Sequence, residues 1–209
     1  MMPPMARGGA YFATHTMKHR IFIAIDIPRP IKGELRRLLA QDVEKYAELY
    51  AGANLMDEES WHVTLAFLGE KSEEQIETIG RMLRAIAGQT PAPTIAIRTL
   101  TTAPPHRPPR MVWAATTTGT NRLLEPIRNT IVKKLAAHAI QQDGETFPLF
   151  NGHVTLARLP EGRRIADHTV SFPDALTFRP KTIGLMESHL EDSGAKYKTL
   201  KSIDFKPSV

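Results

Sequence analysis

The residues of this chain best suited to chemistry are two histidines, His62 and His153, that begin the same pentapeptide, HVTLA. The segments WHVTLAFLGE and GHVTLARLPE agree at seven of ten positions and start 91 residues apart in a chain of 209 residues. Each matched residue type makes up roughly a tenth or less of an average sequence, so a chance repeat among the eight histidines is improbable. The repeat therefore predicts two related halves, each with one His-x-Thr strand.

Alternation along a strand gives each repeat one polar face. Side chains in a strand point to opposite faces in turn, so His62 and Thr64 share a face, as do His153 and Thr155. Two imidazoles with an ordinary pKa of about 6.5 can divide the work of a neutral general base and a protonated general acid. Threonine hydroxyls can donate hydrogen bonds to an oxyanion, so this set suits in-line displacement at phosphorus.

Other interpretations of the histidines are a structural role and a metal site. A lone strand histidine is more often structural, but the duplicated motif favours function. A zinc ion would need a third protein ligand, which His-x-Thr does not supply, and we therefore expect no metal. The chain has no cysteine, which excludes disulfides, thiolate nucleophiles and iron–sulfur clusters.

Hydropathy patterns place the repeats among interleaved helices and strands. The patterns predict strands over residues 20–27, 61–68, 94–100, 111–117, 153–159, 182–190 and 197–205, a short strand near 175–178, and amphipathic helices over 30–50, 72–88 and 120–140. Ser72 and Gln75 have the spacing of a capping box. We expect an α+β fold of two pseudo-symmetric lobes, each an antiparallel sheet with helices packed outside, and an active-site cleft between the sheets.

The domain plan and surroundings follow from composition. Residues 18–209 are expected to form one bilobal catalytic domain with an internal duplication, and residues 1–17 a disordered extension without a signal peptide. Lysine plus arginine number 27 against 22 acidic residues, and the net charge of +5 is compatible with RNA as a partner. There is no apolar run long enough to span a membrane, so we expect a cytoplasmic monomer without a membrane partner.

Taken together, these segments resemble the two-histidine phosphoesterase superfamily, and within it the RNA 2′,3′-cyclic phosphodiesterases, also named 2′–5′ RNA ligases. RIFIAIDIP at 20–28 resembles the opening strand of that family, PPRMVWAA at 108–115 the strand after its mid-chain loop, and MESHLEDSGAKYKTL at 186–200 its closing hairpin. The resemblance implies opening of a terminal 2′,3′-cyclic phosphate on RNA to leave a 2′-phosphate, without a metal or another cofactor. A small cyclic nucleotide stays open as an alternative substrate, because nothing in the sequence fixes the size of the leaving group.

The resemblance also implies roles for single residues. His62 would protonate the departing 3′-oxygen, His153 would activate the attacking water, and Thr64 and Thr155 would hold the nonbridging phosphate oxygens. Arg158 resembles a phosphate-contacting arginine of the family. Strict alternation puts it on the face opposite His153, so it could join the site only if the strand twists or bulges.

Four further residues are candidate RNA contacts. Phe22 could stack on a base or pack in the core. His106, Arg107 and Arg110 occupy a proline-rich stretch that could attract RNA electrostatically or form an exposed basic loop. Gly152 stands where the family often has proline, and we expect it to loosen the start of the second motif strand.

Two alternatives to hydrolysis stay open at this stage. Reversible 2′–5′ joining of RNA ends shares the same transition state, so the sequence does not separate it from hydrolysis. A noncatalytic RNA-binding module is disfavoured, since binding alone does not require a matched pair of proton-transfer groups.

Overall fold

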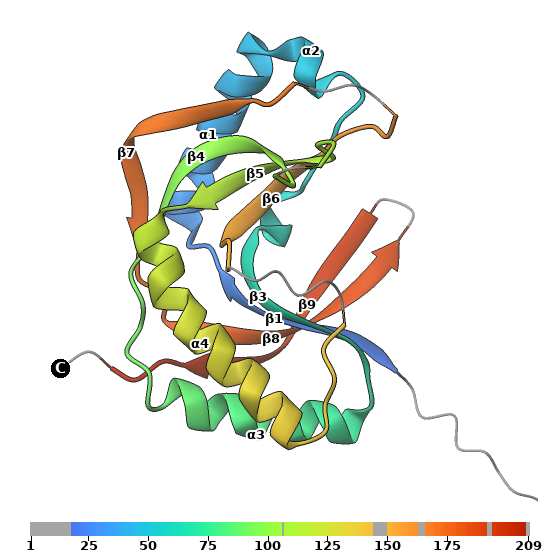
Figure 1. The fold of residues 1–209 in the computed structure, drawn as a ribbon, viewed down its shortest axis with the longest axis vertical. Helices are drawn as coiled ribbons and strands as arrows, with labels where there is room; N and C mark the ends of the chain where they lie inside the picture. Colours follow the sequence, from blue (N-terminus) through green and yellow to red (C-terminus); the bar gives the residue numbers. More distant parts are fainter. Residues whose placement is uncertain (1–17, 106, 144–149, 163–165, 192–193, 208–209) are drawn as a thin grey trace, which may run out of the picture.

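Two antiparallel β-sheets form the centre of the molecule (Figure 1). The computed structural model describes residues 18–105, 107–143, 150–162, 166–191 and 194–207. The extension expected over residues 1–17 and the candidate RNA contact His106 lie outside these residues. The predicted α+β class with two antiparallel sheets is confirmed.

The first sheet has four strands in the order β3-β1-β8-β9. These strands are β1 (His19–Asp26), β3 (His62–Lys71), β8 (Thr182–Glu191) and β9 (Gly194–Asp204). The second sheet has five strands in the order β2-β6-β5-β4-β7. They are β2 (Asn54–Leu55), β4 (Ile95–Ala103), β5 (Met111–Thr116), β6 (His153–Arg158) and β7 (Thr169–Phe178).

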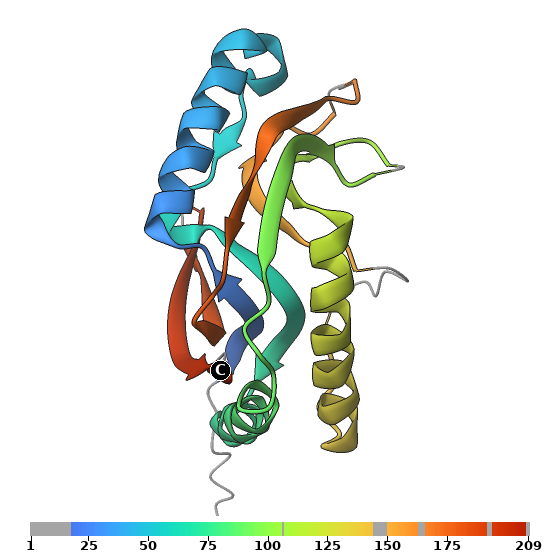
Figure 2. The ribbon, with the colours of Figure 1, turned by 90° about the vertical axis from the view of Figure 1, so that its left-hand side faces the viewer.

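The helices lie outside these two sheets (Figures 1 and 2). They are α1 (Arg29–Lys45), α2 (Ala47–Tyr50), α3 (Glu73–Ala87) and α4 (Thr118–Ala137), with a 3₁₀ turn η1 (Glu58–Ser60) before β3. Helix α3 packs on β8 and β9, α4 packs on β3 and β4, and α1 packs on β7. The predicted capping box is confirmed, because the Ser72 hydroxyl accepts from the Gln75 N–H while the Gln75 side chain accepts from the Ser72 N–H.

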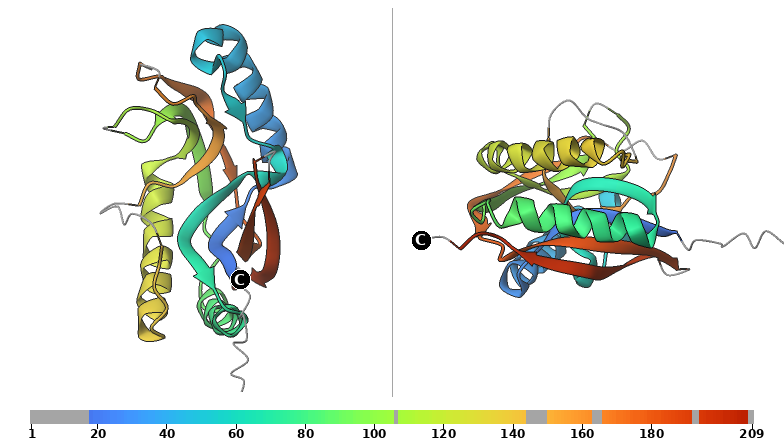
Figure 3. Two further views of the ribbon diagram at one scale, coloured as in Figure 1. Left: turned by 90° about the vertical axis from the view of Figure 1, so that its right-hand side faces the viewer. Right: turned by 90° about the horizontal axis from the view of Figure 1, so that it is seen from below.

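The lobes do not correspond to halves of the sequence, which corrects the simplest interpretation of the repeat. The closing hairpin of β8 and β9 crosses back and pairs β8 with β1, so the C-terminal strands complete the sheet of the first repeat (Figure 3). Strand β1 is the reason, because it is buried through Ile21–Ile25 and needs a hydrogen-bonded neighbour on both sides. Strand β7 is also longer than predicted, since only two of its ten residues are buried and its hydropathy signal is therefore weak.

A β-bulge interrupts both repeat strands at the same position. Along β3, Thr64 pairs with Ala24 of β1 and Ala66 pairs with Ile23, which leaves Leu65 as the extra residue. Along β6, Thr155 pairs with Trp113 and Ala157 with Val112, which leaves Leu156 as the extra residue. Leu65 is 2% exposed and Leu156 is 0% exposed, so each bulge residue is anchored in the hydrophobic core.

One hydrophobic core connects the two sheets and their helices. It includes Val63, Leu65, Val154 and Leu156 from the two repeats, as the alternating pattern predicts. Within the described part of the chain, no helix is long and apolar enough to cross a membrane.

Replacing the bulge residue Leu156 with alanine should lower the free energy of unfolding by about 2–5 kcal/mol, because it removes buried methyl groups and leaves a cavity. Urea unfolding followed by circular dichroism measures this change. Leu123→Ala is the matched control, since that side chain is 50% exposed and its loss should cost under about 0.5 kcal/mol. Equal losses in the two variants would contradict the anchoring role of Leu156.

Candidate active site

His62 and His153 occupy the first position of their strands and are held by the same kind of hydrogen bond. His62 Nδ1 lies 2.7 Å from the carbonyl oxygen of Ser60, and His153 Nδ1 lies 2.8 Å from that of Asn151. A carbonyl oxygen only accepts hydrogen bonds, so each Nδ1 carries a proton and donates it. In the neutral rings Nε2 is then the atom with the free lone pair, and both histidines have the tautomer that a general base acting through Nε2 requires.

The local chain explains these two hydrogen bonds. Ser60 ends the 3₁₀ turn η1, where a carbonyl lacks a partner further along the turn, and it lies two residues before His62. Asn151 has the same offset from His153 at the start of β6. The duplicated strand therefore repeats the orientation of the ring as well as its position.

The two repeat strands lie next to each other although they belong to different sheets. β3 and β6 pack together, and Figure 1 shows them adjacent at the centre of the molecule. The two imidazoles are close enough for a positive charge on His153 to lower the pKa of His62. The tertiary structure thus brings together the two histidines that the sequence singles out.

Burial has the largest effect on the protonation of both rings. Desolvation lowers the pKa of His62 to about 4, against smaller raising effects of the Ser60 hydrogen bond and of Asp26. Desolvation also lowers the pKa of His153, and its hydrogen bond to Asn151 opposes this. At neutral pH both rings are therefore neutral unless a bound anion favours their charged form.

Each histidine rests on different aromatic rings. The His62 ring centroid lies 4.8 Å from that of Phe22 and 5.0 Å from that of Tyr197, which meets it edge-on at 90°. His153 instead stacks on Trp113, with centroids 3.6 Å apart and ring planes within 14°. These rings fix the imidazole planes and exclude water from one side of each.

One face of each repeat strand carries the motif histidine and threonine, and it is here called the tetrad face. The bulges determine which other side chains lie on this face. On β5, residues 111, 113 and 115 share a face by alternation, and they pair with Arg158, Thr155 and His153. Arg158 therefore lies on the tetrad face of β6, as expected if the strand is bulged. By the same argument on β1, Phe67 lies on the tetrad face of β3 with His62 and Thr64.

Phe67 and Arg158 are thus equivalent positions of the two repeats, five residues after the histidine. The Phe67 side chain is 55% exposed, and its ring centroid lies 5.9 Å from that of Phe22. Arg158 is exposed at the end of β6. Thr64 and Thr155 are partly exposed between the histidine and this position. The duplicated geometry therefore presents an aromatic ring from one lobe and a cation from the other.

Gly152 is firmly held, contrary to the expectation that glycine loosens this segment. Its N–H donates to Asn121 Oδ1 at 2.9 Å, and its carbonyl accepts from the Thr116 hydroxyl at 2.9 Å. A Cβ at this position would come within 2.7 Å of the Thr116 hydroxyl. Proline lacks the N–H that binds Asn121, so this site favours glycine.

The other predicted RNA contacts lie in different surroundings. Phe22 is 1% exposed and packs beneath His62, where it supports the imidazole. Arg107 and Arg110 are exposed in the segment between β4 and β5. The Arg110 backbone bridges β4 and the end of β6, since it donates to the Ala103 carbonyl and accepts from the Leu159 N–H.

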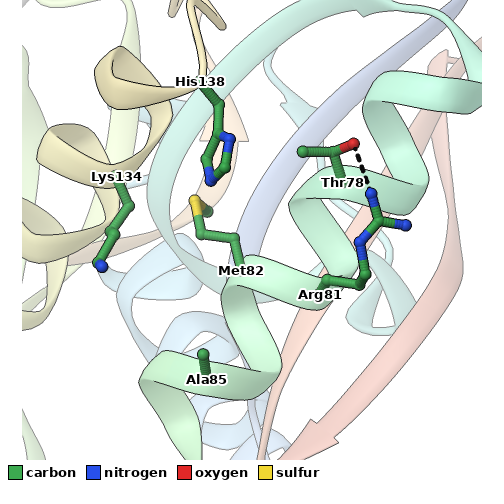
Figure 4. A pocket seen from close by; sticks show the side chains of 6 residues that line it. All are labelled: Thr78, Arg81, Met82, Ala85, Lys134 and His138. Carbon is green, nitrogen blue, oxygen red and sulfur yellow. Dashed lines mark hydrogen bonds between the residues drawn. The ribbon is translucent and has the colours of Figure 1, made fainter.

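A cavity of about 420 Å³ lies away from the tetrad face, between α3 and α4 (Figure 4). It is lined by Thr78, Arg81, Met82, Ala85, Lys134 and His138. None of these residues belongs to the repeats. Among the residues that the structure describes, no group of three or more His, Cys, Asp or Glu side chains is arranged to hold a metal ion.

Sequence reasoning missed Trp113, Tyr197 and Phe67 as neighbours of the histidines. Trp113 and Tyr197 come from strands distant in the sequence, and their hydropathy resembles that of core residues. Phe67 did carry a signal, because it stands opposite Arg158 when the two repeats are aligned.

Comparison with known proteins finds similar sequences among phosphoesterases. A model of the LigT-like phosphoesterase family matches residues 25–113, which include the first repeat. An RNA 2′,3′-cyclic phosphodiesterase of Methanocaldococcus jannaschii is 28% identical over 187 residues, which cover 87% of this chain and 98% of the relative. A protein of the same name from Thermotoga maritima is 26% identical over 192 residues, covering 89% of this chain and 95% of the relative.

Solved structures share the fold. A protein of Thermus thermophilus superposes with a TM-score of 0.70 at 24% identity, covering 90% of this chain and 98% of that one. Escherichia coli LigT in its apo form gives a TM-score of 0.65 at 22% identity, covering 91% of this chain and 99% of that one. The chain is thus similar to LigT-like phosphoesterases over residues 25–113, and to RNA 2′,3′-cyclic phosphodiesterases over most of its length.

The lowered pKa of His62 predicts a loss of stability in acid. The unfolded chain binds a proton to this ring near pH 6.5 and the folded chain only near pH 4, so stability falls as the pH drops between these values, by up to about 3 kcal/mol. His62→Asn should remove the part of this stability loss that comes from His62. Urea unfolding at several pH values measures the free energy of unfolding. The exposed His138→Asn serves as control and should retain the wild-type fall. An unchanged pH dependence in His62→Asn would contradict the prediction.

Proposed function

We propose that this protein hydrolyses RNA 2′,3′-cyclic phosphate ends to 2′-phosphates, without a metal ion, through His62 and His153 as an acid–base pair. The observation that carries the proposal is the matched pair of imidazoles on adjacent strands, each with Nδ1 bound to a carbonyl and Nε2 left for proton transfer. The shared name of the curated relatives supports the choice of a cyclic phosphate on RNA as substrate.

The reaction needs one proton taken and one given. His153 Nε2 accepts a proton from water as the water oxygen bonds to phosphorus. His62, protonated on Nε2 in the substrate complex, gives its proton to the 3′-oxygen as the bond from phosphorus to that oxygen breaks. The products are a 2′-phosphate and a 3′-hydroxyl, and the two histidines end with exchanged protonation states that solvent restores.

The substrate itself favours the required protonation state. Burial lowers the pKa of both rings and so favours their neutral forms. A phosphodiester anion placed between them favours an imidazolium, since an opposite charge nearby raises the pKa of a histidine. Binding of the substrate would therefore favour the protonated form of His62, which the general acid requires.

The remaining residues of the tetrad face have roles in binding. Thr64 and Thr155 would donate hydrogen bonds to the nonbridging oxygens, where negative charge accumulates in the transition state. Arg158 would add a cation on the same face of β6. Phe67 would offer its exposed ring as a stacking surface for the terminal base.

Substituting either histidine with alanine should lower kcat/KM by about 10²–10⁴-fold, because each variant loses one positioned proton transfer. The double variant should fall little further, since the two groups act as a unit. The measurement is product analysis on a defined RNA with a 2′,3′-cyclic end, with and without EDTA. We expect a 2′-phosphate product and no effect of EDTA.

Three outcomes of that assay would overturn parts of the proposal. Activity that survives both single substitutions would exclude the acid–base pair. Inhibition by EDTA would exclude the metal-independent reaction. If RNA with 5′-hydroxyl ends is added, accumulation of a 2′–5′ joined product at ordinary RNA concentrations would indicate that ligation is the main activity.

Phe67→Ala should weaken binding of a nucleotide substrate without changing the chemistry. Base stacking on an aromatic ring contributes about 1–3 kcal/mol, so we expect KM to rise about 5–150-fold with little change in kcat. Leu190→Ala is the control, because it removes another exposed apolar side chain from the same sheet. A rise in KM in the control alone, or in neither variant, would exclude stacking on Phe67.

A further inference from the structure

The two histidines differ in the residue that stands opposite each on the neighbouring strand. The register of β1 and β3 places Asp26 opposite His62, whereas that of β5 and β6 places Ala115 opposite His153. Directly opposite residues of an antiparallel pair have Cβ atoms about 4.5–5.5 Å apart on the same face. His62 therefore has a carboxylate as its cross-strand neighbour, and His153 has a methyl group.

The Asp26 carboxylate is fixed in place by two hydrogen bonds. Its Oδ1 accepts from the Ile27 N–H at 2.8 Å and from the Lys32 ammonium at 3.0 Å. The Lys32 side chain is only 8% exposed and reaches the carboxylate from the first turns of α1. Oδ2 takes part in neither bond. The negative charge thus has a defined position beside His62.

We propose that Asp26 is a positioning residue that directs the catalytic proton to His62, so that His62 and not His153 is the general acid when an anionic substrate is bound. The inference rests on the proposed function, because it requires the two histidines to be the acid–base pair. A perfectly symmetric pair would share the proton equally between its members. The single carboxylate at Asp26 breaks this symmetry.

The charges around His62 support this role. Among the residues that the structure describes, the charged groups that act on His62 are Asp26 on β1, Lys32 on α1 and a protonated His153 on β6, and the ring of Tyr197 on β9 packs against it. Asp26 raises the pKa of His62, while Lys32 and a protonated His153 lower it. Asp26 is thus the carboxylate of the set, and Lys32 limits its effect.

An NMR titration of the two imidazoles in the full-length protein tests the proposal. Saturating sodium sulfate serves as the probe anion, because it does not itself titrate in the relevant range. We expect His62 to titrate at a higher pH than His153. Asp26→Asn should lower the pKa of His62 by roughly half to one unit, a modest shift because the Asp26 side chain is 68% exposed and water screens its charge.

A second substitution should shift the pKa of His62 in the opposite direction. Lys32→Met keeps the apolar stem and removes the cation, so the pKa of His62 should rise. Both substitutions should shift the pKa of His153 less than that of His62, because Asp26 and Lys32 lie beside His62 and reach His153 only through the coupling of the two rings. Glu34→Gln is the matched control, since it removes a carboxylate from the same helix where it faces Arg37, and it should move neither histidine.

The pH–rate profile on a 2′,3′-cyclic nucleotide gives an independent measurement. The limb assigned to His62 should shift to lower pH in Asp26→Asn and to higher pH in Lys32→Met, while the other limb shifts less. An unchanged His62 titration in Asp26→Asn, or a His153 that titrates above His62 in the wild type, would overturn the proposal. Failure of the wild type to hydrolyse cyclic phosphates would instead contradict the proposed function, and the titration would still decide whether Asp26 controls His62.

Discussion

The site depends on one irregularity in backbone pairing, the β-bulge that follows the motif threonine in both repeat strands. With regular alternation, the position five residues after each histidine would point into the core. The extra residue reverses the alternation, so that Leu156 and Ala157 are both buried and Arg158 returns to the face of His153. Strand β3 has the same irregularity, which explains why a residue as apolar as Phe67 stands 55% exposed on the face of His62.

Duplication gives the two lobes equal strands but unequal surroundings. The ring orientation is repeated, because each Nδ1 donates to the carbonyl two residues earlier. The supporting rings are not repeated, since His62 rests on Phe22 and Tyr197 whereas His153 stacks on Trp113. The proposed reaction takes one proton and gives another, so it requires two histidines in unequal surroundings, as found here.

Burial and charge have opposite effects at this site, and their balance links structure to the reaction. Desolvation lowers the pKa of both imidazoles and so favours their neutral forms, which suits a general base but not a general acid. In the proposed reaction, the negative charge of the substrate would favour the protonated form of one imidazole. The protein thus needs only one small electrostatic difference between the rings to direct the proton, and the Asp26–Lys32 pair beside His62 has the position to provide it.

The sequence by itself determined the α+β class, the positions of most strands and helices, and the choice of His62 and His153, because these follow from local periodicity and an intact repeat. It could not determine that β8 and β9 complete the first sheet, since strand pairing over such distances leaves no local pattern. It placed Arg158 only conditionally, because a bulge is defined by the partner strand. The residues opposite each histidine, Asp26 and Ala115, likewise emerge only from the register of paired strands.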